Sequence, residues 1–131
     1  MRAKKAKILV IDDQEEICEL TKAFLLKKDH IVFTATTQEE ALKNLIKEKP
    51  HIILLDMILG EISGLDVLAK IREIDKKVKV IIVTGLYDDD AISKAKAMGI
   101  DDYIVKPFTA DFLNNLILQK LFGASPKPEI K

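Results

Sequence analysis

The chain has 131 residues and carries 21 basic and 21 acidic side chains, so its formal net charge is zero. That length suits one domain with a core of its own. The charge balance argues against a protein that binds nucleic acid mainly through its phosphates. The single cysteine, Cys18, excludes an internal disulfide and fits a reducing compartment. Because residues 1–7 lack an apolar signal core and no apolar run could span a bilayer, we expect a cytoplasmic protein without membrane contact.

In chain order, short apolar runs alternate with segments of helical spacing. The runs predict strands at residues 7–11, 31–33, 51–56, 78–83 and 103–105. Thr37 with Glu40 forms a capping box before the second helix, and Thr109 caps the fifth. Asp88, Asp89 and Asp90 place negative charge at the first turn of the fourth helix, and Gly99 closes that helix.

Apolar residues at helical spacing indicate the first, third and fifth helices. They are Ile17, Leu20, Phe24 and Leu25; Leu65, Leu68 and Ile71; and Phe112, Leu113, Leu116, Ile117 and Leu121. The second helix is expected to carry Ala41, Leu42, Leu45 and Ile46 inward. Five strands alternating with five helices predict an α/β fold, a flavodoxin-like (βα)5 three-layer sandwich with a parallel sheet in the order 2-1-3-4-5. We place this domain at residues 7–122, after a basic extension at 1–6 and before a flexible tail or linker start at 123–131.

Polar groups follow four of the predicted strands at the point where each strand ends. Asp12 and Asp13 follow the first, Asp56 ends the third, Thr84 follows the fourth, and Lys106 follows the fifth. Carboxyl ends of parallel strands meet at one edge of the sheet, so these groups are predicted to meet there. Clustered carboxylates repel one another unless a cation offsets them. Mg²⁺ suits this set because it prefers oxygen ligands.

At this point the chain resembles the receiver domain of two-component response regulators, the CheY-like superfamily, over about residues 7–122. The residues that carry the resemblance are Asp12-Asp13, Asp56, Ser63-Gly64, Thr84, Gly99, Tyr103 and Lys106-Pro107-Phe108. The resemblance implies a signalling module that catalyses only its own phosphorylation and dephosphorylation.

The resemblance also implies roles for single residues. Asp56 would accept a phosphoryl group from a phosphohistidine donor, namely a sensor histidine kinase or a histidine phosphotransfer protein. Mg²⁺ (or Mn²⁺) would be bound by Asp13, Asp56 and the Ile58 carbonyl, and by Asp12 through water. Lys106 and Thr84 would contact the phosphoryl oxygens, and the peptide bond before Pro107 would be cis.

The resemblance further implies a surface that changes on phosphorylation, formed by the fourth helix, the fifth strand and the fifth helix. Tyr103 would be its switch residue, and Ile92 and Lys96 are candidates for its output face, the alternative being ordinary helix surface. This face would bind an unknown downstream protein, or a second copy in a dimer of an otherwise monomeric chain. Ile17 and Phe108 would dock the donor, unless Ile17 is core.

Four positions affect the expected behaviour of the site. Gly60 stands where the family usually has proline, which is expected to loosen that loop. Ile58 and Leu86 flank the expected path of the hydrolytic water and cannot orient it by hydrogen bonding. We therefore expect slow self-dephosphorylation. Gly85, a small residue after Thr84, keeps access to the phosphoacceptor open.

Other functions remain as alternatives. An Asp-nucleophile phosphatase usually needs an acid two residues after its nucleophile, where this chain has Ile58. A nucleotide or flavin binder needs a glycine-rich phosphate loop, whereas Asp12 and Asp13 follow the first strand. A receiver-shaped scaffold that is never phosphorylated is the last alternative. The chain is a stand-alone regulator, a phosphorelay intermediate or part of a longer protein, and no direct binding to nucleic acid is expected.

Overall fold

The computed structural model describes residues 5–85 and 87–123. Its elements in chain order are β1 (Lys7–Ile11), α1 (Glu15–Leu26), β2 (Ile31–Ala35), α2 (Gln38–Glu48), β3 (Ile52–Asp56), β4 (Ile58–Leu59), β5 (Ile62–Ser63), α3 (Gly64–Ile74), β6 (Lys79–Thr84), α4 (Asp89–Ala97), β7 (Asp102–Val105) and α5 (Ala110–Phe122). The alternation of five long strands with five helices is as predicted. The short β4–β5 pair was not predicted.

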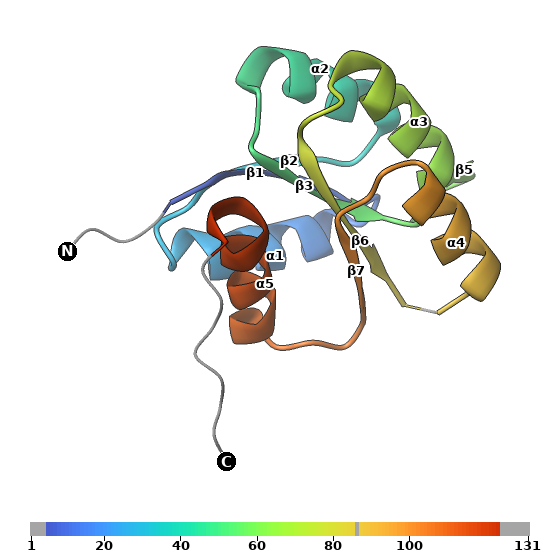
Figure 1. Cartoon of the computed structure of the whole chain (residues 1–131). Helices are drawn as coiled ribbons and strands as arrows, with labels where there is room; N and C mark the ends of the chain where they lie inside the picture. Colours follow the sequence, from blue (N-terminus) through green and yellow to red (C-terminus); the bar gives the residue numbers. More distant parts are fainter. Residues whose placement is uncertain (1–4, 86, 124–131) are drawn as a thin grey trace.

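The five long strands form one parallel sheet in the order β2-β1-β3-β6-β7 (Figure 1). Without the β4–β5 hairpin, this is the predicted order 2-1-3-4-5. The chain places β2 on one side of β1 and then crosses back to place β3 on the other side. The strand order therefore reverses between the neighbouring strands β1 and β3. Ligands of such sheets bind beyond the carboxyl ends of these two strands.

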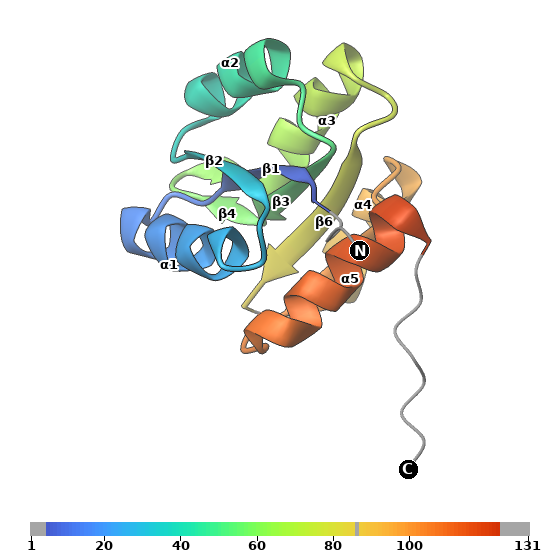
Figure 2. The same ribbon diagram turned by 90° about the vertical axis from the view of Figure 1, so that its left-hand side faces the viewer.

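Helices cover both faces of the sheet, α1 and α5 on one side and α2, α3 and α4 on the other (Figures 1 and 2). The central strand β3 supplies both cores because successive side chains point to opposite faces. Ile53 and Leu55 pack in the core under α2, α3 and α4, whereas Ile52 and Leu54 pack in the core under α1 and α5. Full burial of each such side chain contributes roughly 1.5–3 kcal/mol to stability.

Ile46, which we expected to face inward, is 59% exposed. Leu20, at 60%, Phe24 and Phe112 belong to the apolar residues at helical spacing but are also exposed. In α1 the buried residues are Cys18 and Leu25. Leu20 and Phe24 lie about 200° and 240° round the helix from Cys18, on its solvent side.

The predicted caps lie at the starts of α2, α4 and α5. The hydroxyls of Thr37 and Thr109 accept from the third residue along, and the Asp88 carboxylate accepts from Asp90 N and Ala91 N. One half of the capping box differs, because the Glu40 side chain accepts from Thr36 N at 2.8 Å rather than from the cap residue.

The ends of the described chain refine the predicted boundaries. Ala6, which we placed in the extension, is buried, and its N–H donates to Nδ1 of buried His30 at 3.0 Å. Of the predicted tail, Gly123 ends α5 with φ +67°, and residues 124–131 lie outside the described residues. Among the described helices, none has both the length and the apolar character needed to cross a membrane.

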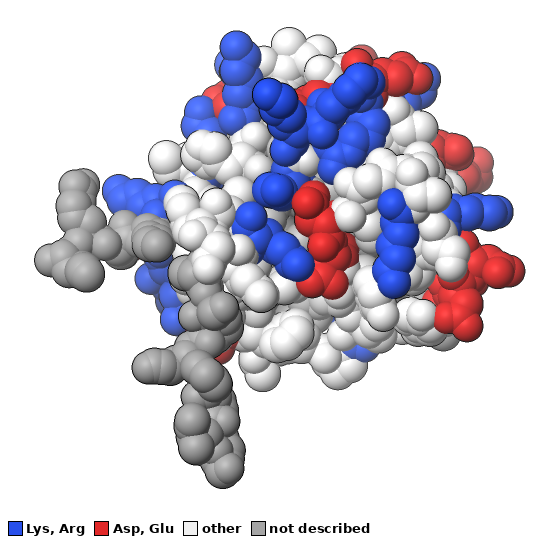
Figure 3. All heavy atoms as spheres, viewed as in Figure 1, with Lys and Arg blue, Asp and Glu red and all other residues white. Residues whose placement is uncertain are grey.

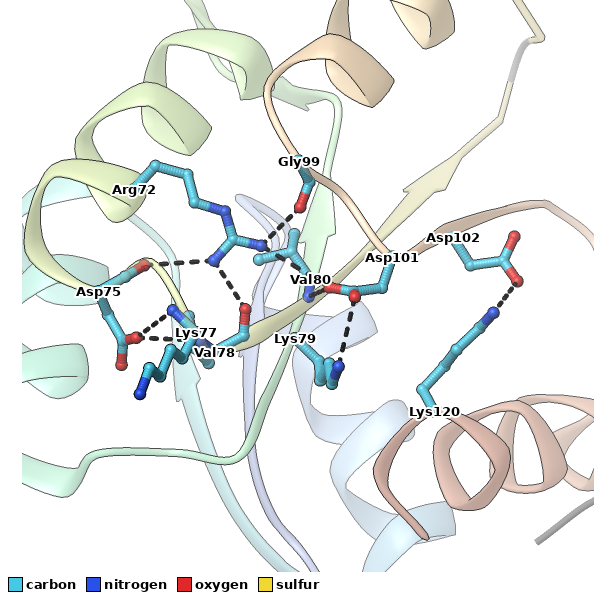
Figure 4. A network of polar contacts seen from close by, with 10 residues as sticks. All are labelled: Arg72, Asp75, Lys77, Val78, Lys79, Val80, Gly99, Asp101, Asp102 and Lys120. Atoms are coloured by element: carbon cyan, nitrogen blue, oxygen red, sulfur yellow. Dashed lines mark hydrogen bonds and ion pairs between the residues drawn. The ribbon is translucent and has the colours of Figure 1, made fainter. Parts of the chain in front are cut away.

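The amino end of the sheet is held together by a polar network around Arg72 (Figure 4). Its Nη1 donates to the carbonyls of Asp75 (3.2 Å) and Val78 (2.7 Å), and its Nη2 donates to that of Gly99 (2.7 Å). Asp101 accepts from Val80 N at 2.8 Å and pairs with Arg72 at 3.7 Å. Lysines extend this network, because Lys79 pairs with Asp101 at 3.7 Å and Lys120 pairs with Asp102 at 3.1 Å. The face seen in Figure 1 accordingly shows acidic side chains bordered by basic ones (Figure 3).

Candidate functional site

The carboxyl ends of β1 and β3 bring three acids together. Asp12, Asp13 and Asp56 each present a carboxylate oxygen, and these oxygens lie within 4.8 Å of one another. Asp12 is buried, Asp56 is half-buried and Asp13 is exposed. The cluster is therefore open on one side, and its oxygen-only donor set suits a hard divalent cation such as Mg²⁺.

A backbone amide holds each carboxylate in place. Asp12 Oδ1 accepts from Gln14 N at 3.0 Å, and Asp56 Oδ1 accepts from Ile58 N at 3.3 Å. Asp13 Oδ2 accepts from Gly60 N at 2.9 Å. The last bond joins the β1–α1 turn to the β4–β5 hairpin, so the hairpin belongs to the site.

The hairpin changes the interpretation of Gly60. Gly60 has φ +64° and is the first residue of a two-residue turn between Leu59 and Ile62, the position at which a type II′ turn takes glycine. Proline has φ near −65° and no N–H, so it fits neither this turn nor the bond to Asp13. The expectation of a loosened loop is therefore not supported, because Gly60 permits an additional ordered contact.

Lys106 supplies the positive charge of the site. Its Nζ lies 3.8 Å from Asp12 Oδ2 and 4.0 Å from Asp56 Oδ2, at ion-pair rather than hydrogen-bond distance. Its backbone N–H donates to the Thr84 carbonyl at 2.8 Å, and the Lys106–Pro107 peptide bond is cis. One ammonium against three carboxylates leaves the cluster negative, which favours a cation.

Burial raises the pKa of the Asp56 carboxyl above its ordinary value of 3.8. The hydrogen bond from Ile58 N and the charge of Lys106 lower this pKa, whereas the nearby Asp12 carboxylate raises it. The net rise shows that the ionised form of Asp56 is disfavoured in the folded protein. A cation or an additional donor at this carboxylate would relieve that cost.

Cys18 lies directly behind the acid cluster. Its Sγ donates to the Asp12 carbonyl at 3.3 Å, and the side chain is buried. Burial and the nearby Asp12 carboxylate raise the pKa of this thiol to about 11. Cys18 therefore acts as a packed core residue and a weak donor rather than as a nucleophile.

A cavity of about 310 Å³ lies beside Asp56, on the α3 and α4 side of the sheet. Its lining residues are Asp56, Met57, Ile58, Ser63, Leu65, Thr84, Gly85, Asp88, Ala91 and Ile92. The placement of Ile92 corrects our prediction, since it is 2% exposed and faces this cavity and core rather than an output surface. Helical spacing alone could not show whether the side chain of Ile92 faces the core or the surface. Leu86 lies outside the described residues.

On the opposite side of Asp56, a smaller cavity of about 30 Å³ has Ile17 and Phe108 in its wall. Both side chains are half-buried, and Asp12, Asp56 and Lys106 line the same cavity. The two predicted docking residues thus meet beside the acid cluster, with Ile17 neither fully core nor fully exposed.

Tyr103 meets a residue that the sequence analysis did not single out. The ring centroids of Tyr103 and Tyr87 lie 5.6 Å apart with a 44° tilt, and Lys96 Nζ lies 5.6 Å from the Tyr103 centroid. Tyr87 is 47% exposed and Lys96 is exposed, so the group lies at the surface between α4 and β7. In the sequence, the signal that Tyr87 lies near the site was weak, namely its position three residues after Thr84.

Gly64 sets the start of α3 tightly against the end of β3. A Cβ at this position would lie 2.6 Å from the Asp56 carbonyl oxygen and 2.8 Å from Met57 Cα. Both are backbone atoms that cannot move without shifting the phosphoacceptor candidate. The need for glycine here is therefore steric.

Comparison with known proteins is consistent with this geometry. The family model described as response regulator receiver domain matches residues 8–118. Sporulation initiation phosphotransferase F of Bacillus subtilis is 32% identical over 115 residues, which are 88% of this chain and 93% of that protein. The alkaline phosphatase synthesis transcriptional regulatory protein PhoP of B. subtilis is 34% identical over 128 residues. That match covers 95% of this chain but 53% of PhoP, so the chain spans about half the length of this relative.

Solved structures are similar over nearly the whole chain. A CheY-like receiver domain protein from Methanospirillum hungatei has a TM-score of 0.85 at 30% identity, covering 90% of this chain and 94% of that one. The BeF3-activated DrrB receiver domain has a TM-score of 0.78 at 30% identity, covering 92% of this chain and all of that one.

Proposed function

The chain belongs to the receiver domain family of two-component response regulators, and on that premise we propose that Asp56 accepts a phosphoryl group. The observation that carries the proposal is the meeting of Asp56 with Asp12, Asp13 and Lys106 at the carboxyl end of the central strand. The donor is a phosphohistidine of a sensor kinase or of a histidine phosphotransfer protein. Ile17 and Phe108 form the apolar surface against which the donor docks.

The proposed reaction is an in-line transfer. An Asp56 carboxylate oxygen attacks phosphorus, the new O–P bond forms, and the P–N bond to the donor imidazole breaks. The imidazole nitrogen keeps the electron pair of that bond and takes up a proton. Lys106 stabilises the negative charge on the phosphoryl oxygens, and the Thr84 hydroxyl donates to one of them once the group is in place.

Asp13 and Asp56, with the Ile58 carbonyl and with Asp12 through water, are the groups that would hold Mg²⁺ or Mn²⁺. When bound, the cation supplies positive charge that offsets the three carboxylates and the incoming phosphoryl group. The residues themselves orient the site, because the Gly60 amide positions Asp13 and the Ile58 amide positions Asp56.

Phosphorylation of Asp56 would attract Thr84 and Lys106 and so shift the surface formed by α4, β7 and α5. Tyr103 is the proposed switch residue, and Lys96 belongs to the output face. This surface binds an unidentified downstream protein or a second copy of the chain. The module thus acts by binding rather than by turning over a separate substrate.

The test is the intact mass of the protein after incubation with acetyl phosphate and Mg²⁺. We expect wild type to gain one phosphoryl group, and we expect Asp56→Asn and a chelator-treated sample to gain none. Asp66→Asn, on the exterior of α3, is the matched control and should behave as wild type. Equal labelling of Asp56→Asn would contradict the proposal, and no labelling with any donor would favour a receiver-shaped scaffold.

Slow loss of the phosphoryl group is a second part of this proposal. The Ile58 side chain is 68% exposed and borders the cavity beside Asp56, yet it cannot hydrogen-bond a water molecule. We expect Ile58→Asn combined with Leu86→Gln to shorten the phosphoprotein lifetime severalfold, measured as decay of the added mass. A wild type that decays as fast as this variant would disprove the hypothesis.

A further inference from the structure

Tyr87 connects three parts of the surface beside the site. Its ring contacts Tyr103 on β7. Its hydroxyl interacts with Asp89, in the first turn of α4, and this hydrogen bonding, burial and the charge of that carboxylate raise the pKa of Tyr87 to about 12. Lys96, on α4, lies over the Tyr103 ring. Tyr103 is therefore in contact with two residues from the α4 region.

The segment that carries Tyr87 begins at Thr84. Thr84 and Gly85 line the cavity of about 310 Å³ beside Asp56, together with Asp88 and Ile92. This cavity is the space into which the segment can close when Thr84 moves toward a phosphoryl group. Because Tyr87 follows Thr84 by only three residues, we expect such closure to move the Tyr87 ring relative to Tyr103.

We infer that Tyr87 is a positioning residue that clamps the switch residue Tyr103 and so opposes closure of the Thr84 segment. The inference rests on the proposed function, because it concerns the cost of the movement that phosphorylation requires. An aromatic pair contributes enough beyond its buried area to change an equilibrium by about two- to tenfold. Loss of the Tyr87 ring should therefore favour the closed form by that factor.

The experiment measures the affinity of the protein for beryllofluoride in the presence of Mg²⁺. We expect Tyr87→Ala to bind it about two- to tenfold more tightly than wild type. Tyr87→Phe keeps the ring and loses the hydroxyl contacts, so its affinity should lie between the two. Phe24→Ala removes a surface aromatic ring from α1 and is the matched control, with an expected affinity equal to that of wild type.

Incorporated 3-fluorotyrosine gives a second measurement, because the chain contains two tyrosines, Tyr87 and Tyr103. In wild type we expect both fluorine resonances to shift with the same midpoint as beryllofluoride is added. A Tyr87 that takes no part in the movement would keep its resonance in place while that of Tyr103 shifts. Tyr87→Phe leaves one resonance and so assigns both.

Two results would overturn the inference while leaving the proposed function intact. One is an affinity of Tyr87→Ala equal to that of wild type. The other is a Tyr103 resonance that shifts while the Tyr87 resonance stays in place. If wild type and Asp56→Asn both fail to bind beryllofluoride, the proposed function fails and the inference fails with it.

Discussion

The two ends of the central sheet handle charge in opposite ways. At the amino end, Asp101 is paired with Arg72 and Lys79 and also accepts from a backbone amide. At the carboxyl end, three carboxylates share one lysine whose Nζ is 3.8 Å from Asp12 and 4.0 Å from Asp56. Charges at the first end are compensated within the chain, whereas those at the second are not.

The difference indicates a division of labour between the two ends. Paired charges at the amino end join the loops before β6 and β7 to α3 and stabilise the fold. Unbalanced negative charges at the carboxyl end lower stability but leave attraction available for a cation, whose positive charge can in turn offset that of a phosphoryl group. Neutralising an acid at each of the two ends should therefore change stability in different directions.

The largest effect is expected for Arg72→Ala at the amino end. It removes three hydrogen bonds to carbonyl groups and the pairing with Asp101, and leaves those groups partly buried. We expect the free energy of unfolding to fall by about 3 kcal/mol, measured by urea denaturation. Lys70→Ala, on the exposed side of the same helix, is the control. If Arg72→Ala lost no more stability than the control, the network at the amino end would not be a source of stability.

Gly64→Ala tests how tightly the carboxyl end is packed. The added methyl group would overlap the backbone at Asp56 and Met57, so we expect a loss of about 2 kcal/mol. Gly85→Ala introduces the same methyl group where no atom lies within 4 Å and should be tolerated. Thermal unfolding of the two variants makes the comparison. Equal melting temperatures would show that β3 and α3 can separate at little cost.

Neutralising one acid at each end should give changes of opposite sign. Asp56→Asn should raise the free energy of unfolding at neutral pH by about 1 kcal/mol, because it removes an unfavourable buried charge. Asp101→Asn should lower it by about 1 kcal/mol, because two ion pairs are lost. Urea denaturation of both variants is the measurement, and changes of the same sign would refute the proposed contrast.

The gain in Asp56→Asn should also depend on pH. The pKa of Asp56 is raised in the folded protein, so its protonated form stabilises the fold below the ordinary pKa of 3.8. That contribution is lost as pH rises through the folded pKa. The advantage of Asn over Asp should therefore be present at neutral pH and disappear in acid, which denaturation at several pH values would detect. A constant difference would show that charge is not its cause.

Magnesium should give the smallest effect. At a concentration equal to its dissociation constant, Mg²⁺ should stabilise wild type by about 0.4 kcal/mol. Asp13→Asn should gain less, and a chelator should reverse the gain in wild type. Asp101→Asn retains the acid cluster and should gain as much as wild type. Equal stabilisation of wild type and Asp13→Asn by Mg²⁺ would place the cation elsewhere.

The sequence predicted the parts of the molecule that repeat a simple pattern. Apolar runs located five strands, and the rules for parallel sheets placed Asp12, Asp56, Thr84 and Lys106 at one edge. The fold and the acid cluster follow from that reasoning because each strand end delivers its polar group to the same place.

Features that depend on particular tertiary contacts were missed. Gly60 looked like a loosening substitution until the hairpin showed its positive φ and its bond to Asp13. Ile92 looked like a helix surface residue, but the orientation of α4 buries it. Arg72 and Asp101 are 29 positions apart and carried no local signal, since their pairing depends on how α3 packs beside the turn before β7.

The position of Cys18 has a practical consequence for labelling experiments. The only thiol of the chain is buried and has a pKa of about 11, so almost none of it is ionised at neutral pH. Reagents that attack thiolates should therefore spare it in the folded protein. A cysteine introduced on the surface, for example at Ile62 in the β4–β5 hairpin, can carry a fluorophore or spin label without prior replacement of the native residue.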